Sequence, residues 1–154
     1  MTLEELTKNY GILEKKYKLP SFSELNENFE IEKIRKGQET LLRTVRKTMM
    51  EKLVNSLGFI ESLLSPINAP RMYLSYLKAV SADDKKEMDR IYSVISEIVI
   101  ASLKLEIDYS EKDEAEMIIR IVKDWESIKP SFRKVIDSMQ KPVSNMVKEK
   151  SYFG

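Results

Sequence analysis

The sequence predicts an all-α fold: a single-domain, up-and-down bundle of five to seven helices. Apolar residues recur three or four positions apart over long stretches, which is the period of an amphipathic helix. The 154 residues include only four glycines and five prolines, so little of the chain suits tight turns between strands. Sustained alternation of polar and apolar residues is missing, as are the Asn-Gly and Asp-Gly steps typical of hairpins. We expect the domain to span residues 1–148, with residues 149–154 as a frayed tail.

Two helices are predicted before residue 30. The first covers residues 3–17, where a helical period links Leu3, Leu6, Tyr10, Leu13 and Tyr17. The Leu19-Pro20 step ends it, because the residue before a proline avoids the α region. Ser21 followed by Glu24 is a capping box, which predicts a short second helix over residues 22–28.

The clearest element is a long helix predicted over residues 38–65, with Gly37 before it and Pro66 after it as natural ends. One face carries an apolar stripe at helical spacing, formed by Leu42, Val45, Met49, Leu53, Leu57, Ile60 and Leu64. The first half is basic on its outer face. The second half, residues 53–64, has Glu61 as its only charged residue, so we expect it to be buried on most sides.

Two further helices are expected in the middle of the chain. Asn68 can cap a short helix over residues 71–80, and Pro70 suits its first turn. Ser81 is an N-cap for a longer helix over residues 82–107, which has acidic residues in its first turn. The side of this helix that faces the core is predicted to hold Met88, Ile91, Ile95, Ile98, Val99 and Leu103.

The last major helix is expected to start after the N-cap Ser110. Its apolar stripe is formed by Met117, Ile118, Ile121, Val122, Trp125, Ile128, Phe132, Ile136 and Met139. Because a proline inside a helix removes a backbone hydrogen bond, we expect the helix to break at Pro130. The short connections at residues 66–69, 78–82 and 107–111 predict antiparallel neighbours.

The composition excludes several kinds of chemistry. The chain has no cysteine, which excludes a disulfide, a thiolate nucleophile and a cysteine-based zinc site. It also has no histidine, which excludes an imidazole general base, a Ser-His-Asp triad and a histidine-ligated metal. Glycine-rich phosphate-binding motifs and the Gly-x-Ser-x-Gly elbow are absent from the sequence. We therefore expect a protein that is not an enzyme, with no catalytic residue, metal site or cofactor.

The sequence does not predict a membrane protein. Its first residues are acidic and amphipathic, unlike the basic segment and apolar run of a signal peptide. The most apolar window, around residues 91–105, is interrupted by Ser93, Glu97 and Lys104, so it is too polar to span a bilayer. We expect a cytoplasmic protein with no membrane partner.

Charge is unevenly distributed along the chain. Residues 33–52 hold seven basic and two acidic side chains, for a net charge of +5. Residues 81–116 hold five basic and eleven acidic side chains, for a net charge of −6. The basic face of the long helix is the candidate contact surface for a nucleic acid or a protein partner, through Lys36, Arg43, Arg46 and Lys47. The alternatives are a solvated helix face, or a face covered by the acidic region of the same or a second chain, and the sequence leaves these open.

Paired carboxylates at helical spacing are the remaining candidates for chemistry. The three pairs are Asp84 with Glu87, Glu111 with Glu114, and Asp113 with Glu116. Such pairs on facing helices can hold Mg²⁺ in all-helical hydrolases. All three, however, lie in first turns of predicted helices, where acidic residues are favoured by the helix dipole.

Two short stretches resemble a known group of proteins. Residues 18–25 read Lys-Leu-Pro-Ser-Phe-Ser-Glu-Leu, and residues 125–129 read Trp-Glu-Ser-Ile-Lys. The first is similar to a Lys-Leu-Pro-Ser-Phe-x-x-Leu segment that precedes a long helix in small archaeal all-helical proteins. The resemblance implies an archaeal source and an all-α fold, and it carries no activity that could be transferred.

These observations lead to one principal expectation about function. We expect a non-enzymatic interaction or structural module that acts through an exposed helix face, in a homodimer or a larger complex. The support is apolar residues that lie beside the main stripes, namely Leu41, Met50, Leu63 and Ile119. The alternatives are a nucleic-acid-binding protein that uses the basic face of the helix over residues 38–65, and a Mg²⁺-dependent helical hydrolase.

Overall fold

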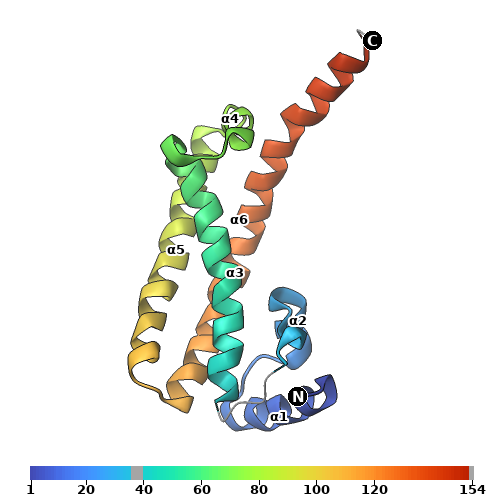
Figure 1. The fold of residues 1–154 in the computed structure, drawn as a ribbon. Helices are drawn as coiled ribbons and strands as arrows, with labels where there is room; N and C mark the ends of the chain where they lie inside the picture. The colour runs from blue at the N-terminus through green and yellow to red at the C-terminus, as the bar shows by residue number, and fades with distance from the viewer. Residues whose placement is uncertain (36–39, 153–154) are drawn as a thin grey trace. The chain divides into compact units, whose positions relative to one another are not determined.

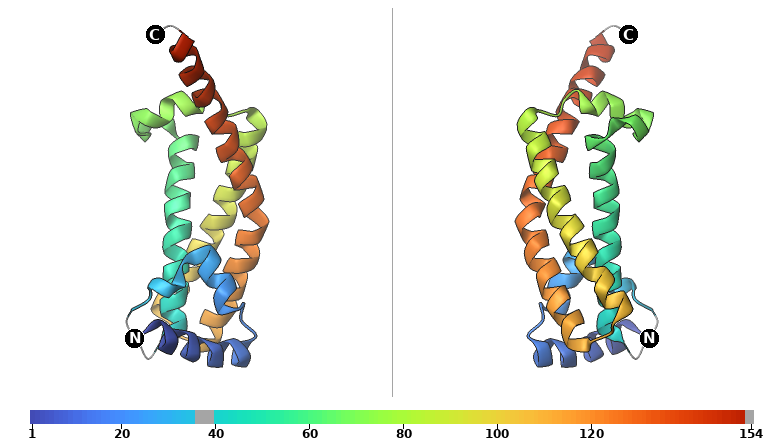
Figure 2. Two further views of the ribbon diagram at one scale, coloured as in Figure 1. Left: turned by 90° about the vertical axis from the view of Figure 1, so that its right-hand side faces the viewer. Right: turned by 90° about the vertical axis from the view of Figure 1, so that its left-hand side faces the viewer.

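The computed structural model describes residues 1–35 and 40–152, and their side chains except those of Asn68 and residues 142–152. Regular structure in this part of the chain is entirely helical, with six α-helices, two short 3₁₀ turns and no strand, which confirms the predicted class. The long helices α3, α5 and α6 pack together as a bundle (Figure 1 and Figure 2). The helices are α1 (Leu3–Tyr17), α2 (Phe22–Phe29), α3 (Leu41–Leu64), α4 (Arg71–Leu77), α5 (Ala82–Ile107) and α6 (Glu111–Tyr152).

The chain groups into two compact units, and all three long helices contribute a segment to each. The first unit contains Met1–Asn55 and Glu97–Trp125, and so includes α1, α2 and the first part of α3. The second unit contains Ser56–Ser96 and the chain from Glu126 onward, and so includes α4. Within the described helices, no segment is both long and apolar enough to cross a bilayer.

Helix starts follow the predicted capping residues closely. The side-chain oxygen of Ser21 accepts a hydrogen bond from the Glu24 backbone N–H at 3.2 Å, which is one of the two hydrogen bonds of a capping box. Ser81 caps α5, and Ser110 caps α6 by accepting from the Asp113 N–H at 3.3 Å. The short helix α4 differs from expectation, because its N-cap is Pro70 without a side-chain hydrogen bond. It also ends at Leu77 and not at residue 80.

The first two helices are tied to the first unit by aromatic side chains. The Tyr10 hydroxyl donates to the Pro20 carbonyl at 2.7 Å, so the turn between α1 and α2 is held from the inside. The ring of Phe29, at the end of α2, packs on Trp125 of α6 with 5.9 Å between centroids. The Lys52 ammonium lies 5.4 Å from the same Trp125 ring. These contacts place α2 against α3 and α6.

The second half of α3 is less buried than its lack of charge predicts. The apolar stripe is buried at Leu42, Val45, Met49, Leu53 and Ile60, and Leu63 takes the place of Leu64. In the second half, however, Val54, Asn55 and Gly58 are exposed, so the expectation of burial on most sides is wrong. A lack of charge lowers the cost of burial but does not supply a neighbour to pack against. The expected start at Gln38 lies outside the described residues.

One predicted core position of α5 is also wrong. Leu103 is exposed and its neighbour Ser102 is buried. The buried positions of this helix follow a regular three- and four-residue spacing through Ile91, Ile95, Ile98, Ser102 and Leu105. Successive residues of a helix are rotated by about 100° about its axis, so Leu103, which follows the buried Ser102, points to solvent.

The expected break at Pro130 is wrong as well, because α6 is one continuous helix from Glu111 to Tyr152. Pro130 is exposed, as is Glu126, whose carbonyl loses its usual N–H partner on a side of the helix that water can reach. Beyond the proline the buried positions are Val135 and Met139, while the expected Phe132 and Ile136 are only half-buried. The core contacts on both sides of the proline hold the helix together.

We predict that Pro130→Ala raises the free energy of unfolding by about 1–3 kcal/mol, because alanine restores the hydrogen bond to Glu126 and has higher helix propensity. Urea denaturation followed by circular dichroism measures the change. Pro70→Ala is the matched control, because Pro70 is the N-cap of α4 and interrupts no helix; its effect should be near zero. A loss of stability in Pro130→Ala would contradict a continuous α6.

Candidate functional site

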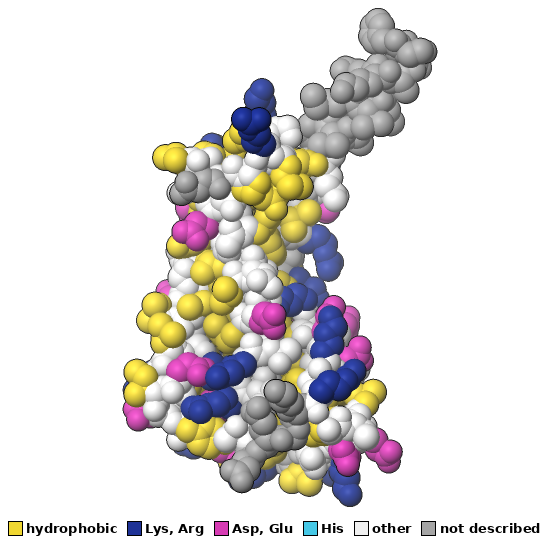
Figure 3. All heavy atoms as spheres, viewed as in Figure 1, with side chains coloured by type: hydrophobic (Ala, Val, Ile, Leu, Met, Phe, Trp, Pro, Cys, Tyr) yellow, Lys and Arg dark blue, Asp and Glu magenta, His cyan; other side chains and the backbone are white. Residues whose placement is uncertain are grey.

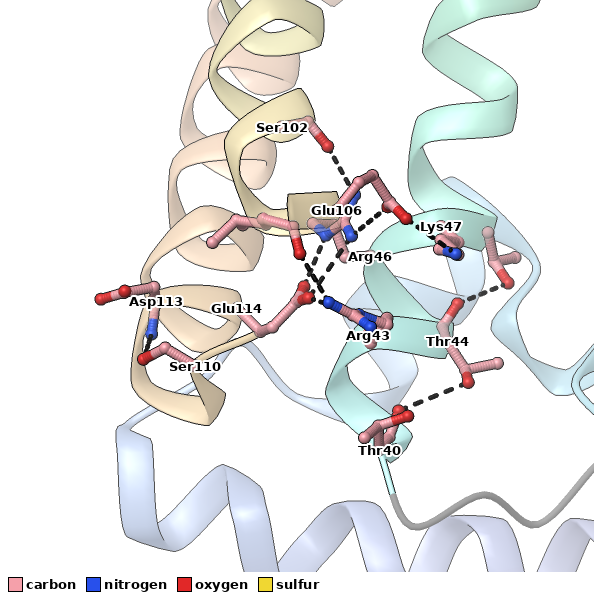
Figure 4. A network of polar contacts seen from close by, with 12 residues as sticks. Thr40, Arg43, Thr44, Arg46, Lys47, Ser102, Glu106, Ser110, Asp113 and Glu114 are labelled. Carbon is pink, nitrogen blue, oxygen red and sulfur yellow. Dashed lines mark hydrogen bonds and ion pairs between the residues drawn. The ribbon is translucent and has the colours of Figure 1, made fainter. Parts of the chain in front are cut away.

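Two of the predicted contact residues on α3, Arg43 and Arg46, point into the protein and not away from it. Figure 4 shows the side chains of Arg43 and Arg46 directed toward α5 and α6, where Glu106 and Glu114 meet them. The Arg46 side chain is 2% exposed and the Glu114 side chain is 0% exposed. Lys36, the fourth predicted residue, lies outside the described residues.

Arg46 is at the centre of a closed network of hydrogen bonds. Its Nε donates to Glu114 Oε2 at 2.5 Å, and one terminal nitrogen donates to Ser102 Oγ at 2.5 Å. The other terminal nitrogen donates to Glu106 Oε1 at 2.6 Å. All three nitrogens of the guanidinium group are therefore engaged by α5 and α6. The burial of Ser102, which the sequence pattern did not predict, is explained by its role as an acceptor.

Arg43 is the second arginine that binds the Glu114 carboxylate. Its Nε donates to Glu114 Oε1 at 3.3 Å, and a terminal nitrogen donates to the Leu105 carbonyl at 2.6 Å, at the end of α5. The guanidinium lies over the ring of Tyr109, 4.9 Å from its centroid. Glu114 is thus held between two arginines, and this pairing makes its burial tolerable.

The outer edge of the network is more exposed. Lys47 pairs with Glu106 at 3.0 Å, and the Lys47 side chain is 54% exposed. Hydrogen bonds from Arg46 and then from Lys47 hold the pKa of Glu106 below its ordinary value. Burial disfavours the charged guanidinium of Arg46, but its hydrogen bonds to Glu114 and Glu106 outweigh burial and raise its pKa. Both groups are therefore charged at neutral pH.

Arg43 and Arg46, on the basic face of α3, are bound by the acidic region of the same chain. A contact with the acidic region is one of the alternatives that the sequence leaves open, and the opposite net charges of residues 33–52 and 81–116 indicate it. Arg46 cannot reach a phosphate group in this conformation, because its donors are buried and occupied. Of the predicted contact residues that the structure describes, only Lys47 presents most of its surface to solvent.

Asp84 and Glu111, which belong to two of the three carboxylate pairs, have structural partners. Asp84 accepts from the Ser81 N–H at 3.2 Å as part of the cap of α5. Glu111 accepts from Lys16 at 2.8 Å and from the Tyr17 hydroxyl at 2.5 Å, which ties α1 to α6. No group of three acidic side chains suitable for a metal ion occurs among residues whose placement is described.

A shallow pocket lies beside the turn between α5 and α6. Its volume is about 360 Å³, and its lining is formed by Ala101, Lys104, Leu105, Asp108, Asp113, Glu116, Met117 and Arg120. Two of these residues are basic and three are acidic. The charges of opposite sign compensate one another within the pocket, so it offers no concentrated field for a charged substrate.

Apolar side chains are exposed in places that differ from those expected. Met50 and Leu63 are buried, and Ile119 is 38% exposed. The larger exposed set lies on the last three turns of α5, at Ile100, Leu103 and Ile107, which are 67%, 54% and 81% exposed. We call these three residues the α5 face. Figure 3 shows hydrophobic side chains along the edge of the molecule over this helix.

A second exposed apolar set lies in the other unit, around α4. It consists of Ile67, Met72 and Leu74, and none of the residues of α4 is buried. This set is short, because α4 has only seven residues. The α5 face has the more regular helical spacing of the two.

Comparisons with family models, curated proteins and solved structures found no match. Function therefore has to be inferred from the side chains themselves. The described residues offer two distinctive features: a closed ionic network inside the first unit and an exposed apolar helix face on α5.

We predict that Arg46→Met lowers the free energy of unfolding by about 3–5 kcal/mol, because Glu114 loses its buried partner and keeps only the longer contact to Arg43. Urea denaturation provides the measurement. Lys47→Met, a control on the exposed edge of the same network, should change stability by about 1 kcal/mol or less. The double variant Arg46→Met with Glu114→Leu should recover most of the loss, since the fully buried charge is gone and Arg43, which is partly exposed, keeps its hydrogen bond to the Leu105 carbonyl. Equal effects of Arg46→Met and Lys47→Met would show that burial of the pair does not matter.

We predict a pH-dependent contribution from Glu106. Because its pKa is lower in the folded than in the unfolded protein, it stabilises the fold above its unfolded pKa. That stability is lost as the pH falls through the lowered folded value. The difference in free energy of unfolding between wild type and Glu106→Gln should therefore be largest near neutral pH and shrink at acidic pH. Denaturation series from pH 7 to pH 3 measure it, and a difference that is constant over this range would contradict the assignment.

Proposed function

We propose that this protein is a non-enzymatic interaction module that self-associates through the α5 face. The observation that carries the proposal is the exposure of Ile100, Leu103 and Ile107 on one side of a single helix. Exposed apolar residues scattered singly are normal, but a row at helical spacing marks a packing surface.

The α5 helix is apolar on two sides. Its inner side buries Ile98 and Leu105, together with Ser102 of the ionic network. Ile100 and Ile107 lie on the opposite side, where the first unit provides no cover. Full burial of an isoleucine or leucine side chain is worth about 1.5–3 kcal/mol, so covering this row is a substantial driving force for association.

The two alternatives have lost their main support. Arg43 and Arg46, the strongest candidates for phosphate contacts, form hydrogen bonds within the chain. Asp84, Glu111 and Glu114, which a magnesium hydrolase would use, act as caps or ion-pair partners. An interaction module requires none of these groups to be free.

Sedimentation equilibrium over a wide concentration range tests the proposal. We predict a reversible dimer for the wild-type protein and a monomer for Ile107→Glu, because a glutamate in the α5 face would be buried without a partner. Ile67→Glu is the matched control: Ile67 is 95% exposed but lies in the other unit, so association should persist.

A circular dichroism melt of each variant verifies that the exposed substitutions leave the fold intact. A wild-type protein that stays monomeric at every concentration would overturn the proposal. Persistent dimers of Ile107→Glu would place the contact elsewhere on the molecule.

A further inference from the structure

We propose that the α5 face docks on the same face of a second copy with the two α5 helices antiparallel, held by two reciprocal Lys104–Glu97 ion pairs. The inference rests on the proposed function, self-association through this face, and adds its orientation and its charged contacts. It follows from the spacing of five residues on one stretch of helix.

The apolar residues have the spacing of a short coiled-coil seam. Ile100, Leu103 and Ile107 are separated by three and then four residues. This is the spacing of the apolar core positions in a heptad repeat. Glu97 and Lys104 lie seven residues apart, so they occupy equivalent positions two turns apart on the same flank of the seam. They carry opposite charges, and both lie beside the apolar row.

The charges decide between the two possible orientations. A two-fold axis that relates antiparallel helices brings the same flank of both copies together, with the residue order reversed. When Ile100 of one copy packs against Leu103 of the other, Glu97 of each copy meets Lys104 of its partner. In a parallel pair, Lys104 of one copy would lie beside the opposite flank of the other copy. The nearest residue there is Val99, which carries no charge. Only the antiparallel pairing therefore satisfies both charges, and it does so twice.

Both charged groups are available for such a contact. Lys104 is exposed and has no ion pair with any residue that the structure describes. The Glu97 side chain is 74% exposed, and its one contact is to Arg120 at the long distance of 3.7 Å. On the opposite flank, Glu106 is already bound by Arg46 and Lys47. The ionic network therefore occupies the flank of the seam that holds Glu106. The flank that holds Glu97 and Lys104 is left for contacts between copies.

The size of the contact sets the expected affinity. The seam covers about three turns of helix. It is therefore smaller than the roughly 1,200–2,000 Å² typical of stable interfaces. We expect a reversible dimer with a dissociation constant on the order of micromolar. An exposed ion pair adds little affinity on its own, but charge reversal places two like-charged pairs at the interface.

The test is a charge swap followed by sedimentation equilibrium. Lys104→Glu and Glu97→Lys should each weaken the wild-type dimer by at least about tenfold, because each creates two repulsive contacts. The double variant that carries both changes should return to near wild-type affinity, since the ion pairs are re-formed in reverse. Lys8→Glu, a charge reversal at an exposed site on α1, is the control and should leave the affinity unchanged.

A cross-linking experiment reads the orientation independently. The chain has no cysteine, so single cysteines can be introduced without background. Glu97→Cys and Lys104→Cys proteins, one of them lengthened by a tag, are mixed under mild oxidation. Antiparallel pairing should give mainly the mixed disulfide, because positions 97 and 104 then face each other. Parallel pairing instead places positions 97 and 104 of the two copies on opposite sides of the seam and should give little of any disulfide.

The outcomes separate this inference from the proposal on which it rests. Dimers that are sensitive to Ile107→Glu but indifferent to Lys104→Glu and Glu97→Lys would overturn the ion pairs and leave the α5 face as the interface. Dimers that form without an enriched mixed disulfide between positions 97 and 104 would overturn the orientation. A monomeric wild-type protein would overturn self-association itself, and the inference with it.

Discussion

The ion pair between Arg46 and Glu114 is the constraint on which the first unit depends. The carboxylate has no exposed surface, and the guanidinium that meets it is almost as deeply buried. A buried charge without its partner is strongly destabilising, so neither helix can shift without breaking the contact. Because Arg46 also binds Ser102 and Glu106, the same interaction fixes how α5 is rotated about its axis.

That rotation explains why α5 presents an apolar face to solvent. With the polar Ser102 turned inward as an acceptor, the adjacent Leu103 must turn outward, together with Ile100 and Ile107. The arrangement places a polar side chain inside and large apolar ones outside, the opposite of simple hydrophobic burial. Such an inversion is understandable where a second surface covers the exposed side, which is the physical basis of the proposed self-association.

Much of the fold could be predicted from local signals. The bounds of α1 and α5 and the caps at Ser21, Ser81 and Ser110 depend on residues close in sequence, so propensity and capping rules apply directly. The continuity of α6 through Pro130 could not be predicted in this way. It depends on Ile128, Val135 and Met139 keeping their core contacts while the proline faces water. The exposure of the second half of α3 likewise depends on which helices lie nearby.

The sequence by itself determined the helical class, the places where helices start, and the absence of any histidine or cysteine chemistry. Each of these is a property of composition or of residues within one turn of each other. Only the tertiary structure decided that the positive charges of α3 and the negative charges of α5 and α6 satisfy one another. A charged helix face looks the same in sequence whether it awaits a partner or has one, because the partner lies about sixty residues away along the chain. Once the network is closed, the apolar side of α5 stays exposed on the first unit.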